Sequence, residues 1–418
     1  MNPALSLFTF DLLVNPRGAA MTRPIRVLSL YEGFFAGGAR ILHSDVVAGL
    51  HRRGDQHHSI LSIASEAQRE STRQRMTQDP RYLRLVGDGV PVMTLGRTAG
   101  AVPPEPESFS DRELRIARDA VASADLILSL KEQPLGLLLA LQERGWMTDV
   151  PVAACLHRSD PTHSGPALGW LAEASATGLL TSTISCAQST SEAYARFTNL
   201  DTPHHVIPNG IDTERFRPGT ADEVKETRER LSIPAGVPVV VFAARFDAMK
   251  NPGLFLRAMV EHSARRPDTH YILCGAGMTL SNDAFRALVA ESGVTVTSNL
   301  HPLGIRDDMP SIYQIADIVA LTSAFGEASP LCLLEGAACG ATPVTTRVGD
   351  AARAAADIGM VTTHDPAEIA ARWESVLARR NELRAAAIAA RPRVGRDRMI
   401  SDYHTTIEYL VREQRAAA

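Results

Sequence analysis

Short apolar or β-branched runs alternate with amphipathic stretches along the chain from residue 25 onward. This alternation predicts parallel sheets covered by helices on both faces, because parallel strands need long crossover connections that helices supply. The expected strands are Ile25–Leu30, Ile60–Ile63, Val90–Leu95, Leu126–Leu130, Val150–Leu156, Ser182–Cys186, Val239–Ala244, Tyr271–Cys274, Val294–Thr297, Ile318–Thr322, Thr342–Thr345 and Met360–Thr362. The expected helices include Ala39–Arg53, Asp111–Ala122 and Leu135–Arg144.

A turn-rich segment divides this alternation into two halves of comparable size. Pro203–Arg217 combines two prolines, a glycine and turn formers, which is typical of a linker between domains. We therefore expect two α/β domains, each with its own sheet, at residues 21–205 and 206–395. Residues 396–418 are expected to form a closing helix, with its core at Arg396–Glu413. Residues 1–20 form a tail to which we assign no function.

Residues 65–88 interrupt the alternation of expected strands and helices, because they are polar and rich in arginine. We favour a solvated helix and loop here. The alternative is a lid over a substrate, because loops inserted at sheet edges often carry specificity.

Composition excludes several classes of protein. The 418 residues are 45% hydrophobic and carry a formal charge of -4 without a basic stripe, so nucleic-acid binding is not expected. No apolar run is long enough to cross a bilayer, and acidic residues interleave the arginines of residues 65–88, so peripheral membrane contact is not indicated. The five cysteines form no C-x-x-C pair and lie in apolar runs, which favours reduced thiols in a cytoplasm. No cluster of residues has the spacing of a metal site.

The strongest candidate for chemistry lies at residues 324–344, in the C-terminal half. Glu327 follows the expected strand 318–322, and Glu335 lies eight residues later on a helix that begins near Ser329–Pro330. The free amides at such a helix start can bind an anion, and the two carboxylates can accept hydrogen bonds from sugar hydroxyls around it. On one helix the glutamates would be ~12 Å apart, beyond the ~5–9.5 Å that a glycosidase pair requires. Exposed charge on a helix is the plain alternative.

Two cations follow the first strand of the same half. Arg245 lies at the carboxyl end of strand 239–244, and Lys250, one of only three lysines in the chain, follows in the next loop. Ligands of open α/β sheets bind at the carboxyl ends of strands, and these two cations suit a diphosphate there. Two solvated loop cations are the alternative.

The N-terminal half supplies two weaker candidates. Gly37–Gly38 lies between the first strand and the first helix, where bare backbone can approach a phosphate or a sugar. His157 directly follows strand 150–156, and from there it can face a cleft between the domains. A lone Gly-Gly or a lone histidine is more often structural.

Together these four elements resemble the family 4 glycosyltransferases, retaining enzymes of GT-B architecture, in which two Rossmann-like domains face a central cleft. Glu327 and Glu335 reproduce the E-x7-E motif of that family. Further similarities are the two cations Arg245 and Lys250, the hinge-like segment 206–216, the nucleotide-side G-x-G of 272–278 with Gly275, the donor-loop glycines Gly37 and Gly38, and the catalytic-centre histidine His157. Departures are Gly336 where alanine usually follows the second glutamate, Gly349–Asp350 where Gly-Gly is usual, and Ala351–Ala352 where Pro-Glu is frequent.

The resemblance implies a role for each site residue. Arg245 and Lys250 would neutralise the diphosphate, with help from the amides of Leu331 and Cys332. Glu335 would hold the ribose, and Glu327 the transferred sugar. His157 would bridge the donor sugar and its phosphate.

The resemblance also implies the reaction. The donor would be a nucleotide-diphosphate sugar, with a UDP-sugar favoured, and the N-terminal domain would hold the acceptor. The acceptor would be a hydroxyl compound, with a soluble small molecule favoured over a lipid. Transfer would occur on the face of the leaving group, with retention and without a metal cofactor, since no D-x-D occurs in the sequence. The arginine-rich, lysine-poor composition points to a bacterium with a GC-rich genome.

Three other functions use similar folds. A UDP-sugar 2-epimerase would act on a sugar nucleotide without an acceptor, and a non-catalytic subunit would only bind the nucleotide. A pyridoxal-dependent phosphorylase would need a Schiff-base lysine deep in the C-terminal domain. Only Lys225 and Lys250 lie in that half, and neither has the strand context that such a lysine requires.

Overall fold

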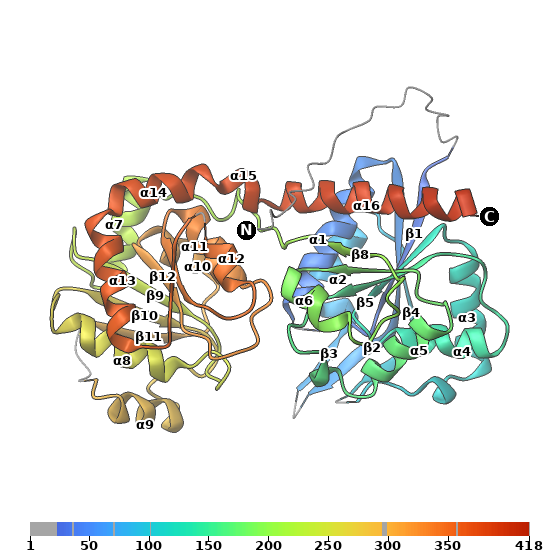
Figure 1. Cartoon of the computed structure of the whole chain (residues 1–418), viewed down its shortest axis with the longest axis horizontal. Coiled ribbons are helices and arrows are strands. Elements are labelled where there is room, and N and C mark those ends of the chain that lie inside the picture. The colour runs from blue at the N-terminus through green and yellow to red at the C-terminus, as the bar shows by residue number, and fades with distance from the viewer. Residues whose placement is uncertain are drawn as a thin grey trace, which may run out of the picture.

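Two sheets, each with helices packed against it, organise the chain into two lobes that lie side by side (Figure 1). The computed structural model describes residues 23–35, 37–69, 72–100, 102–294, 299–356 and 358–417. The expected tail at residues 1–20 lies outside them. No helix in these ranges is long and apolar enough to span a membrane.

The elements alternate as expected from the sequence. The first lobe contains β1 (Ile25–Tyr31), α1 (Gly38–Arg53), β2 (Gln56–Arg69), β3 (Thr72–Arg75), η1 (Met76–Gln78), α2 (Pro80–Gly87), β4 (Val92–Ala99), η2 (Pro106–Ser108), α3 (Asp111–Ala122), β5 (Leu126–Leu130), α4 (Leu135–Glu143), β6 (Val152–Leu156), η3 (Pro161–Ser164), α5 (Ala167–Ala176), β7 (Ser182–Ser185), α6 (Gln188–Tyr194) and β8 (His204–Val206). The remaining elements are α7 (Ala221–Arg230), β9 (Val239–Ala243), α8 (Pro252–Ser263), β10 (His270–Cys274), α9 (Asp283–Glu291), β11 (Leu300–Gly304), α10 (Met309–Gln314), β12 (Ile318–Leu321), α11 (Leu331–Cys339), β13 (Thr342–Thr346), α12 (Ala351–Ala355), β14 (Met360–Thr362), α13 (Pro366–Ala378), α14 (Arg380–Ala389), α15 (Arg391–Val394) and α16 (Arg396–Ala417).

Both sheets have the strand order of a doubly wound fold. The first runs β3-β2-β1-β5-β6-β7-β8, with β4 paired to β2, and the second runs β11-β10-β9-β12-β13-β14. Every described pairing is parallel except β2 with β3. The order reverses between β1 and β5 and again between β9 and β12. At such a reversal the loops at the carboxyl ends diverge and leave a crevice for a ligand.

Strand β1 illustrates why helices cover both faces of the first sheet. Its side chains alternate between two apolar clusters, so that Leu28 and Leu30 pack on one face and Ile25 and Val27 on the other. Each of these four residues is at most 1% exposed. A strand buried on both faces reads as a continuous apolar run, which is the signal seen in the sequence.

The prediction for residues 65–88 was partly wrong. β2 continues to Arg69 and turns into β3, so that this segment begins as an antiparallel hairpin rather than a loop. Across the hairpin, Arg73 donates two hydrogen bonds of 2.7 and 2.5 Å to the carboxylate of Glu66, and Thr98 of β4 donates a third. Polar cross-strand pairs therefore stabilise a strand that lacks an apolar signal. The expected helix is present only as α2.

The strand predicted at Val294–Thr297 falls largely outside the described residues. Val294 itself is not in a strand, and β11 lies further along the chain at Leu300–Gly304. Its Pro302 and its half-buried positions weaken the strand signal in the sequence.

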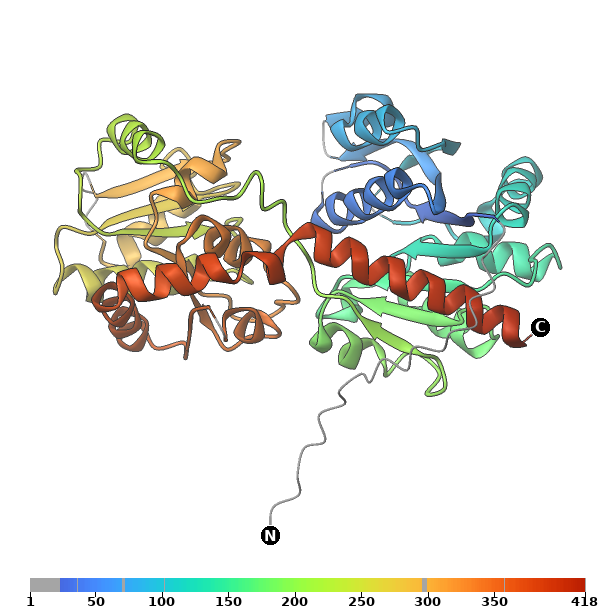
Figure 2. The ribbon, with the colours of Figure 1, turned by 90° about the horizontal axis from the view of Figure 1, so that it is seen from above.

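The long helix α16 returns from the second lobe and crosses the first, as Figures 1 and 2 show in two views. Met399, Tyr403 and Ile407 on its inner face join the same cluster as Val27 of β1. Gly49 of α1 permits the close crossing, because a Cβ there would lie 2.4 Å from Ile400 Cδ1. The predicted closing helix is thus present, and it completes the core of the N-terminal lobe.

Candidate functional site

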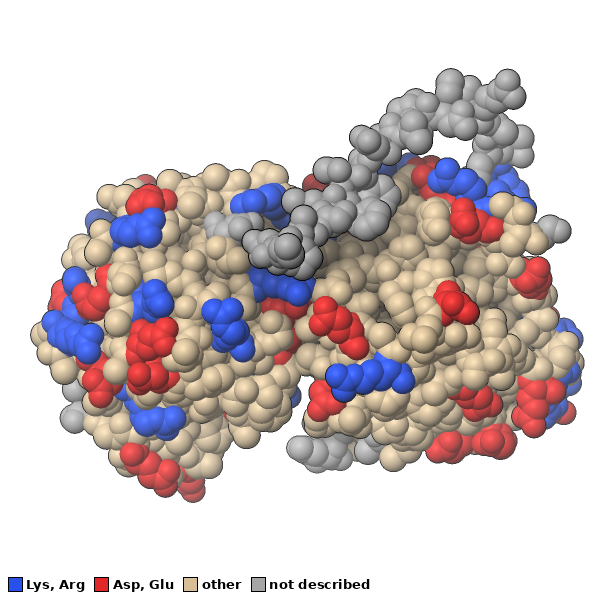
Figure 3. Space-filling view, viewed as in Figure 1, with Lys and Arg blue, Asp and Glu red and all other residues tan. Residues whose placement is uncertain are grey.

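A cavity of about 390 Å³ lies between the two lobes, at the strand reversals of both sheets. One wall follows β1, β5 and β6 of the first sheet, and the other comprises loops that follow β9 and β12 of the second. Its lining residues are Gly38, Ala39, Leu42, Lys131, His157, Arg158, Cys186, Asn209, Lys250, Gly326, Glu327, Ala328, Ser329, Pro330 and Leu331. Figure 3 shows a notch between the two lobes at the lower edge of this face, with acidic and basic side chains interspersed over both lobes.

Lys250 and Glu327 form an ion pair at the second-lobe wall of this cavity. Lys250 Nζ donates to Glu327 Oε1 at 2.5 Å, and the two side chains are 17% and 4% exposed. Asn251 holds Lys250 in place by adopting a left-handed conformation and capping α8 through the N–H of Leu254. Thr322, directly after β12, donates to the carbonyls of Lys250 and Asn251. The carboxyl ends of the two neighbouring strands thereby fix the pair.

Hydrogen bonds through Ser323 fix the loop that carries Glu327. Ser323 donates to Glu327 Oε1, and the carbonyl of Ser323 accepts from Thr346 at 2.7 Å and from His364 at 2.9 Å. Gly349 passes so close that a Cβ there would lie 1.7 Å from the carbonyl oxygen of Glu327, and its φ is +51°. Only glycine fits at that position without moving the Glu327 backbone.

Helix α11 begins at this wall without a side-chain cap. Pro330 precedes its first residue, and Leu331 lines the cavity. Burial raises the pKa of Cys332 to about 12, while Lys250 acts in the opposite direction and Glu327 in the same one. The Cys332 thiol therefore stays neutral, and its amide belongs to a helix start that favours an anion.

His157 faces this ion pair from the first lobe. It directly follows β6 and lines the cavity, and its Nε2 is buried without a hydrogen-bond partner among the described residues. Burial is the main cause that lowers the pKa of His157 to about 3, with smaller effects from His43 and Lys131. The imidazole is therefore neutral near pH 7. Its Nε2 therefore keeps an unused capacity for a hydrogen bond.

The two glycines after β1 differ in their placement. Gly38 begins α1 and lines the cavity, and nothing lies within 4 Å of the place where its Cβ would be. Gly37 precedes it, and its carbonyl accepts from Arg40 and Ile41 in the first turn of α1. Bare backbone is thus presented to the cavity at Gly38, whereas Gly37 shapes the helix start.

Five residues predicted from the sequence are not among the lining residues of this cavity: Gly37 and Cys332, which adjoin it in the chain, and Arg245, Gly275 and Glu335. Arg245 follows β9, but its side chain is 70% exposed and pairs with Asp247 at 3.0 Å. Gly275 follows β10 with φ +136°, and a Cβ there would lie 1.9 Å from the carbonyl oxygen of Ala244, so close strand packing already requires glycine. Glu335 lies one helical turn beyond Leu331.

The buried surroundings of Glu335 change its pKa. Burial raises its pKa to about 7, against the opposing effects of Arg215 and of the Tyr313 hydroxyl. The group therefore titrates near neutral pH, where an ordinary glutamate is fully ionised.

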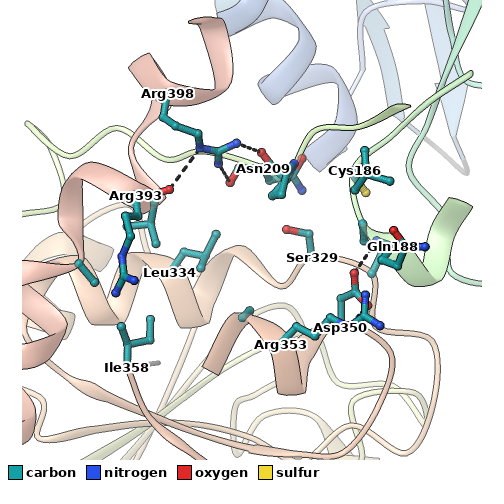
Figure 4. Close-up of a pocket in the computed structure, with 17 residues that line it drawn as sticks. Cys186, Gln188, Asn209, Ser329, Leu334, Asp350, Arg353, Ile358, Arg393 and Arg398 are labelled. Atoms are coloured by element: carbon teal, nitrogen blue, oxygen red, sulfur yellow. Dashed lines mark hydrogen bonds and ion pairs between the residues drawn. The ribbon is translucent and has the colours of Figure 1, made fainter. Parts of the chain in front are cut away.

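A second cavity, of about 460 Å³, lies beside the first and shares Cys186, Asn209, Ala328 and Ser329 with it. Figure 4 shows its walls, which again come from both lobes. Asp350 of the second lobe accepts hydrogen bonds from the backbone N–H groups of Gln188 (2.6 Å) and Ser189 (3.3 Å) at the start of α6. The N–H of Asp350 in turn donates to the carbonyl of Glu327 at 3.3 Å. This contact between lobes is therefore joined directly to the loop that carries Glu327.

Four residues that the fold brings to these cavities were given no site role from the sequence: Lys131, Arg158, Asn209 and Asp350. Lys131 carried a usable signal, because it is one of three lysines and directly follows a buried strand. Arg158 carried a signal of the same kind, because it directly follows His157 at the end of β6. The positions of Asn209 and Asp350 depend on how the lobes meet. Among the described residues, no group of three or more His, Cys, Asp or Glu side chains is placed to hold a metal ion.

The architecture identifies the class of protein. Two Rossmann-like domains with a cleft at both strand reversals are the GT-B fold, and solved GT-B structures match it over nearly the whole chain. The Anabaena protein Alr3699/HepE, crystallised with UDP, aligns with a TM-score of 0.72 at 18% identity, covering 92% of this chain and 100% of its own. The expected fold is confirmed.

Sequence comparison finds a family match over part of the chain. Residues 223–393 match the family described as "Glycosyl transferases group 1". The D-inositol 3-phosphate glycosyltransferase of Corynebacterium jeikeium is 31% identical over 172 residues, which are 39% of this chain and 41% of the relative. The enzyme of the same name from Salinispora arenicola is 33% identical over 187 residues, which are 42% of this chain and 41% of that relative. The resemblance to family 4 glycosyltransferases is confirmed, and the chain spans about two fifths of the length of these relatives.

Proposed function

We propose that the protein is a retaining glycosyltransferase that moves a sugar from a nucleotide diphosphate, UDP being favoured, to a hydroxyl group of a soluble small molecule. The observation that carries this proposal is the cavity between the lobes. There the Lys250–Glu327 ion pair and the start of α11 lie opposite the unpartnered Nε2 of His157. The family match and the UDP held by a protein of the same fold add support.

In this proposal the second lobe stabilises the leaving group. Lys250 Nζ has three hydrogens and gives one to Glu327, so others remain for a phosphate oxygen. The amides of Leu331 and Cys332 add the positive end of α11. Arg245, exposed at the rim, and Gly275 contribute to the nucleotide side. Because Arg245 lies at the rim, Lys250 is the residue that supplies positive charge to the diphosphate inside the cavity.

Glu327, Glu335 and His157 would orient the donor. Glu327 accepts hydrogen bonds from the hydroxyls of the transferred sugar, and Glu335 from those of the ribose. The neutral imidazole of His157 bridges the sugar and its phosphate, while the bare backbone at Gly38 leaves room for both. The acceptor hydroxyl attacks the anomeric carbon from the side of the departing diphosphate. As the new C–O bond forms and the old one breaks, the hydroxyl proton passes to a phosphate oxygen, so the configuration is retained.

Two further parts of the proposal concern the setting of the reaction. Transfer proceeds without a metal ion, and protein cations stabilise the leaving diphosphate. We place the enzyme in a bacterial cytoplasm, which fits its five free cysteines.

The test is release of nucleotide diphosphate from a panel of UDP-, GDP- and dTDP-sugars, first without acceptor and then with candidate acceptors that include D-inositol 3-phosphate. Slow hydrolysis of one donor that is lost in Glu327→Ala and in Lys250→Ala supports the proposal. Conversion of a UDP-sugar to its epimer would replace it with the epimerase. Loss of transfer in EDTA and its return with magnesium would refute the metal-independent part.

A further inference from the structure

A third cavity, of about 560 Å³, lies in the first lobe next to the cavity between the lobes. Lys131 and Arg158 line both, so the two spaces share one wall. Its other lining residues include Glu32, Arg40, Gln133 and Ser164. It therefore opens onto the place where the proposed reaction occurs, on the side opposite the ion pair of the second lobe.

The shared wall carries two cations whose charged groups form no direct ion pair among the described residues. Among the described residues, neither the Lys131 ammonium nor the Arg158 guanidinium forms a hydrogen bond or an ion pair, and Arg158 Nε is buried without a partner. Each of these cations has lost part of its hydration with nothing in exchange, which is unfavourable unless a ligand restores the contacts. The two also repel each other, since Arg158 contributes to lowering the pKa of Lys131 to about 8, after burial and Arg40.

Nearby carboxylates do not neutralise this pair of cations. Glu32 is already engaged by Arg40, whose Nη2 lies 2.7 Å from Glu32 Oε2 and whose Nε donates to the carbonyl of Gly33. Glu132 is 0% exposed and accepts from the Tyr194 hydroxyl; burial raises its pKa, while Arg158 and Lys131 act in the opposite direction. Lys131, Arg158 and Arg40 are thus three cations near two carboxylates. The wall therefore keeps an excess of positive charge.

Lys131 reaches this wall from an unfavourable backbone conformation. Lys131 has φ +68°, a left-handed conformation that a lysine rarely adopts. Its N–H and carbonyl are both used, by Cys155 and by Ser129, so that the residue is fixed in place directly after β5. Gln133, two residues later, is 8% exposed and lines the third cavity with an Oε1 that has no hydrogen-bond partner. A ligand hydroxyl would satisfy it.

We infer that Lys131 and Arg158 bind an oxyanion of the acceptor, a phosphate or a carboxylate, and that Gln133 accepts a hydrogen bond from one of its hydroxyls. This inference rests on the proposed function and names the acceptor class, a small polyhydroxylated anion. The two cations straddle the cavities, so an anion held there leaves a neighbouring hydroxyl group at the mouth of the donor site. A neutral sugar or polyol would leave both cations unpaired and would bind weakly.

The test separates this site from the donor site by occupying the donor site first. Calorimetry measures inorganic phosphate, and acetate in a second arm, binding to the full chain saturated with UDP. We expect phosphate to bind the wild type and Lys225→Gln, an exposed lysine on α7 that serves as the matched control. Lys131→Gln and Arg158→Gln should each weaken phosphate at least tenfold, the loss of one charge-assisted contact, with UDP affinity unchanged.

Each outcome decides the matter. Equal phosphate binding by wild type, Lys131→Gln and Arg158→Gln would overturn the inference, and so would absence of both phosphate and acetate binding. Weakened UDP binding in the two variants would overturn it as well, because the cations would then serve the donor. Failure of UDP to bind the wild type would instead refute the donor site. The anion site would still be tested in that case, because phosphate binding can be measured on the UDP-free protein. The acetate arm shows whether a carboxylate can replace the phosphate.

Discussion

The ion pair between Lys250 and Glu327 allows stability and catalysis to be measured separately. Its side chains are 17% and 4% exposed, so Lys250→Met leaves a buried carboxylate with Ser323 as its remaining hydrogen-bond donor. Breaking such a pair from one side costs about 3–5 kcal/mol. Glu327→Gln should cost less, about 1–2 kcal/mol, because the more exposed ammonium can still reach water.

The double variant decides whether the two groups interact. Lys250→Met with Glu327→Gln buries no charge, so we expect it to lie within about 2 kcal/mol of the wild type, which gives a coupling of about 2 kcal/mol or more. Urea unfolding followed by fluorine NMR of 5-fluorotryptophan is a suitable assay, because Trp373 reports the C-terminal lobe while Trp146 and Trp170 report the other. Strict additivity of the two single losses would refute the ion pair.

Activity should not follow stability in this series. If Lys250 stabilises the leaving diphosphate, the double variant regains stability but its donor turnover stays about 10²–10³-fold below the wild type. Recovery of turnover together with stability would mean that the pair only supports the fold.

Three other perturbations test the surroundings of the site. Gly336→Ala places a Cβ 2.6 Å from Val319 Cγ1 and should cost about 1–3 kcal/mol in thermal unfolding, most of which Val319→Ala in the same chain restores; an unchanged Tm would contradict this packing. Burial raises the pKa of Glu335 from 4.5 to about 7, so the wild type should lose up to about 3 kcal/mol of stability as pH rises from 4.5 through 7, and equal losses in Glu335→Gln would rule out this residue as the cause. Asp350→Ala removes the hydrogen bond to Gln188 between the lobes and should increase the radius of gyration in X-ray scattering, whereas an unchanged value would show that other contacts hold the lobes together.

The sequence predicted the features that depend on local periodicity. Fully buried strands such as Leu126–Leu130 and Ile318–Leu321 appear where their apolar runs indicated them. The hairpin of β2 and β3 was not predicted, since polar residues such as Glu66 and Arg73 form its cross-strand contacts. Burial alone gives a strand its apolar signal, and this hairpin is stabilised without it.

In the candidate site, too, local sequence patterns predicted some residues and not others. Lys250 and Glu327 could be placed together because neighbouring parallel strands bring their carboxyl ends to one edge. The exposure of Arg245 and the position of Glu335 beyond the cavity could not be predicted, because a side chain's direction depends on tertiary neighbours such as Asp247. The Asp350 contact depends on two lobes meeting, which no local pattern encodes. Whether the predicted residues bind a donor stays a prediction.

Helix α16 has a consequence for how the molecule is made. The inner face of the helix fills the apolar cluster around β1 and α1 with residues drawn from the last part of the chain: Met399, Ile400, Tyr403, Ile407, Leu410 and Val411. A ribosome synthesises the N-terminal lobe first, yet that lobe lacks one side of its core until α16 has been synthesised. The second lobe has all its strands before α16 emerges. The lobe made first is therefore the last to be completed, and during synthesis its uncovered face is the part of the nascent chain most in need of a chaperone.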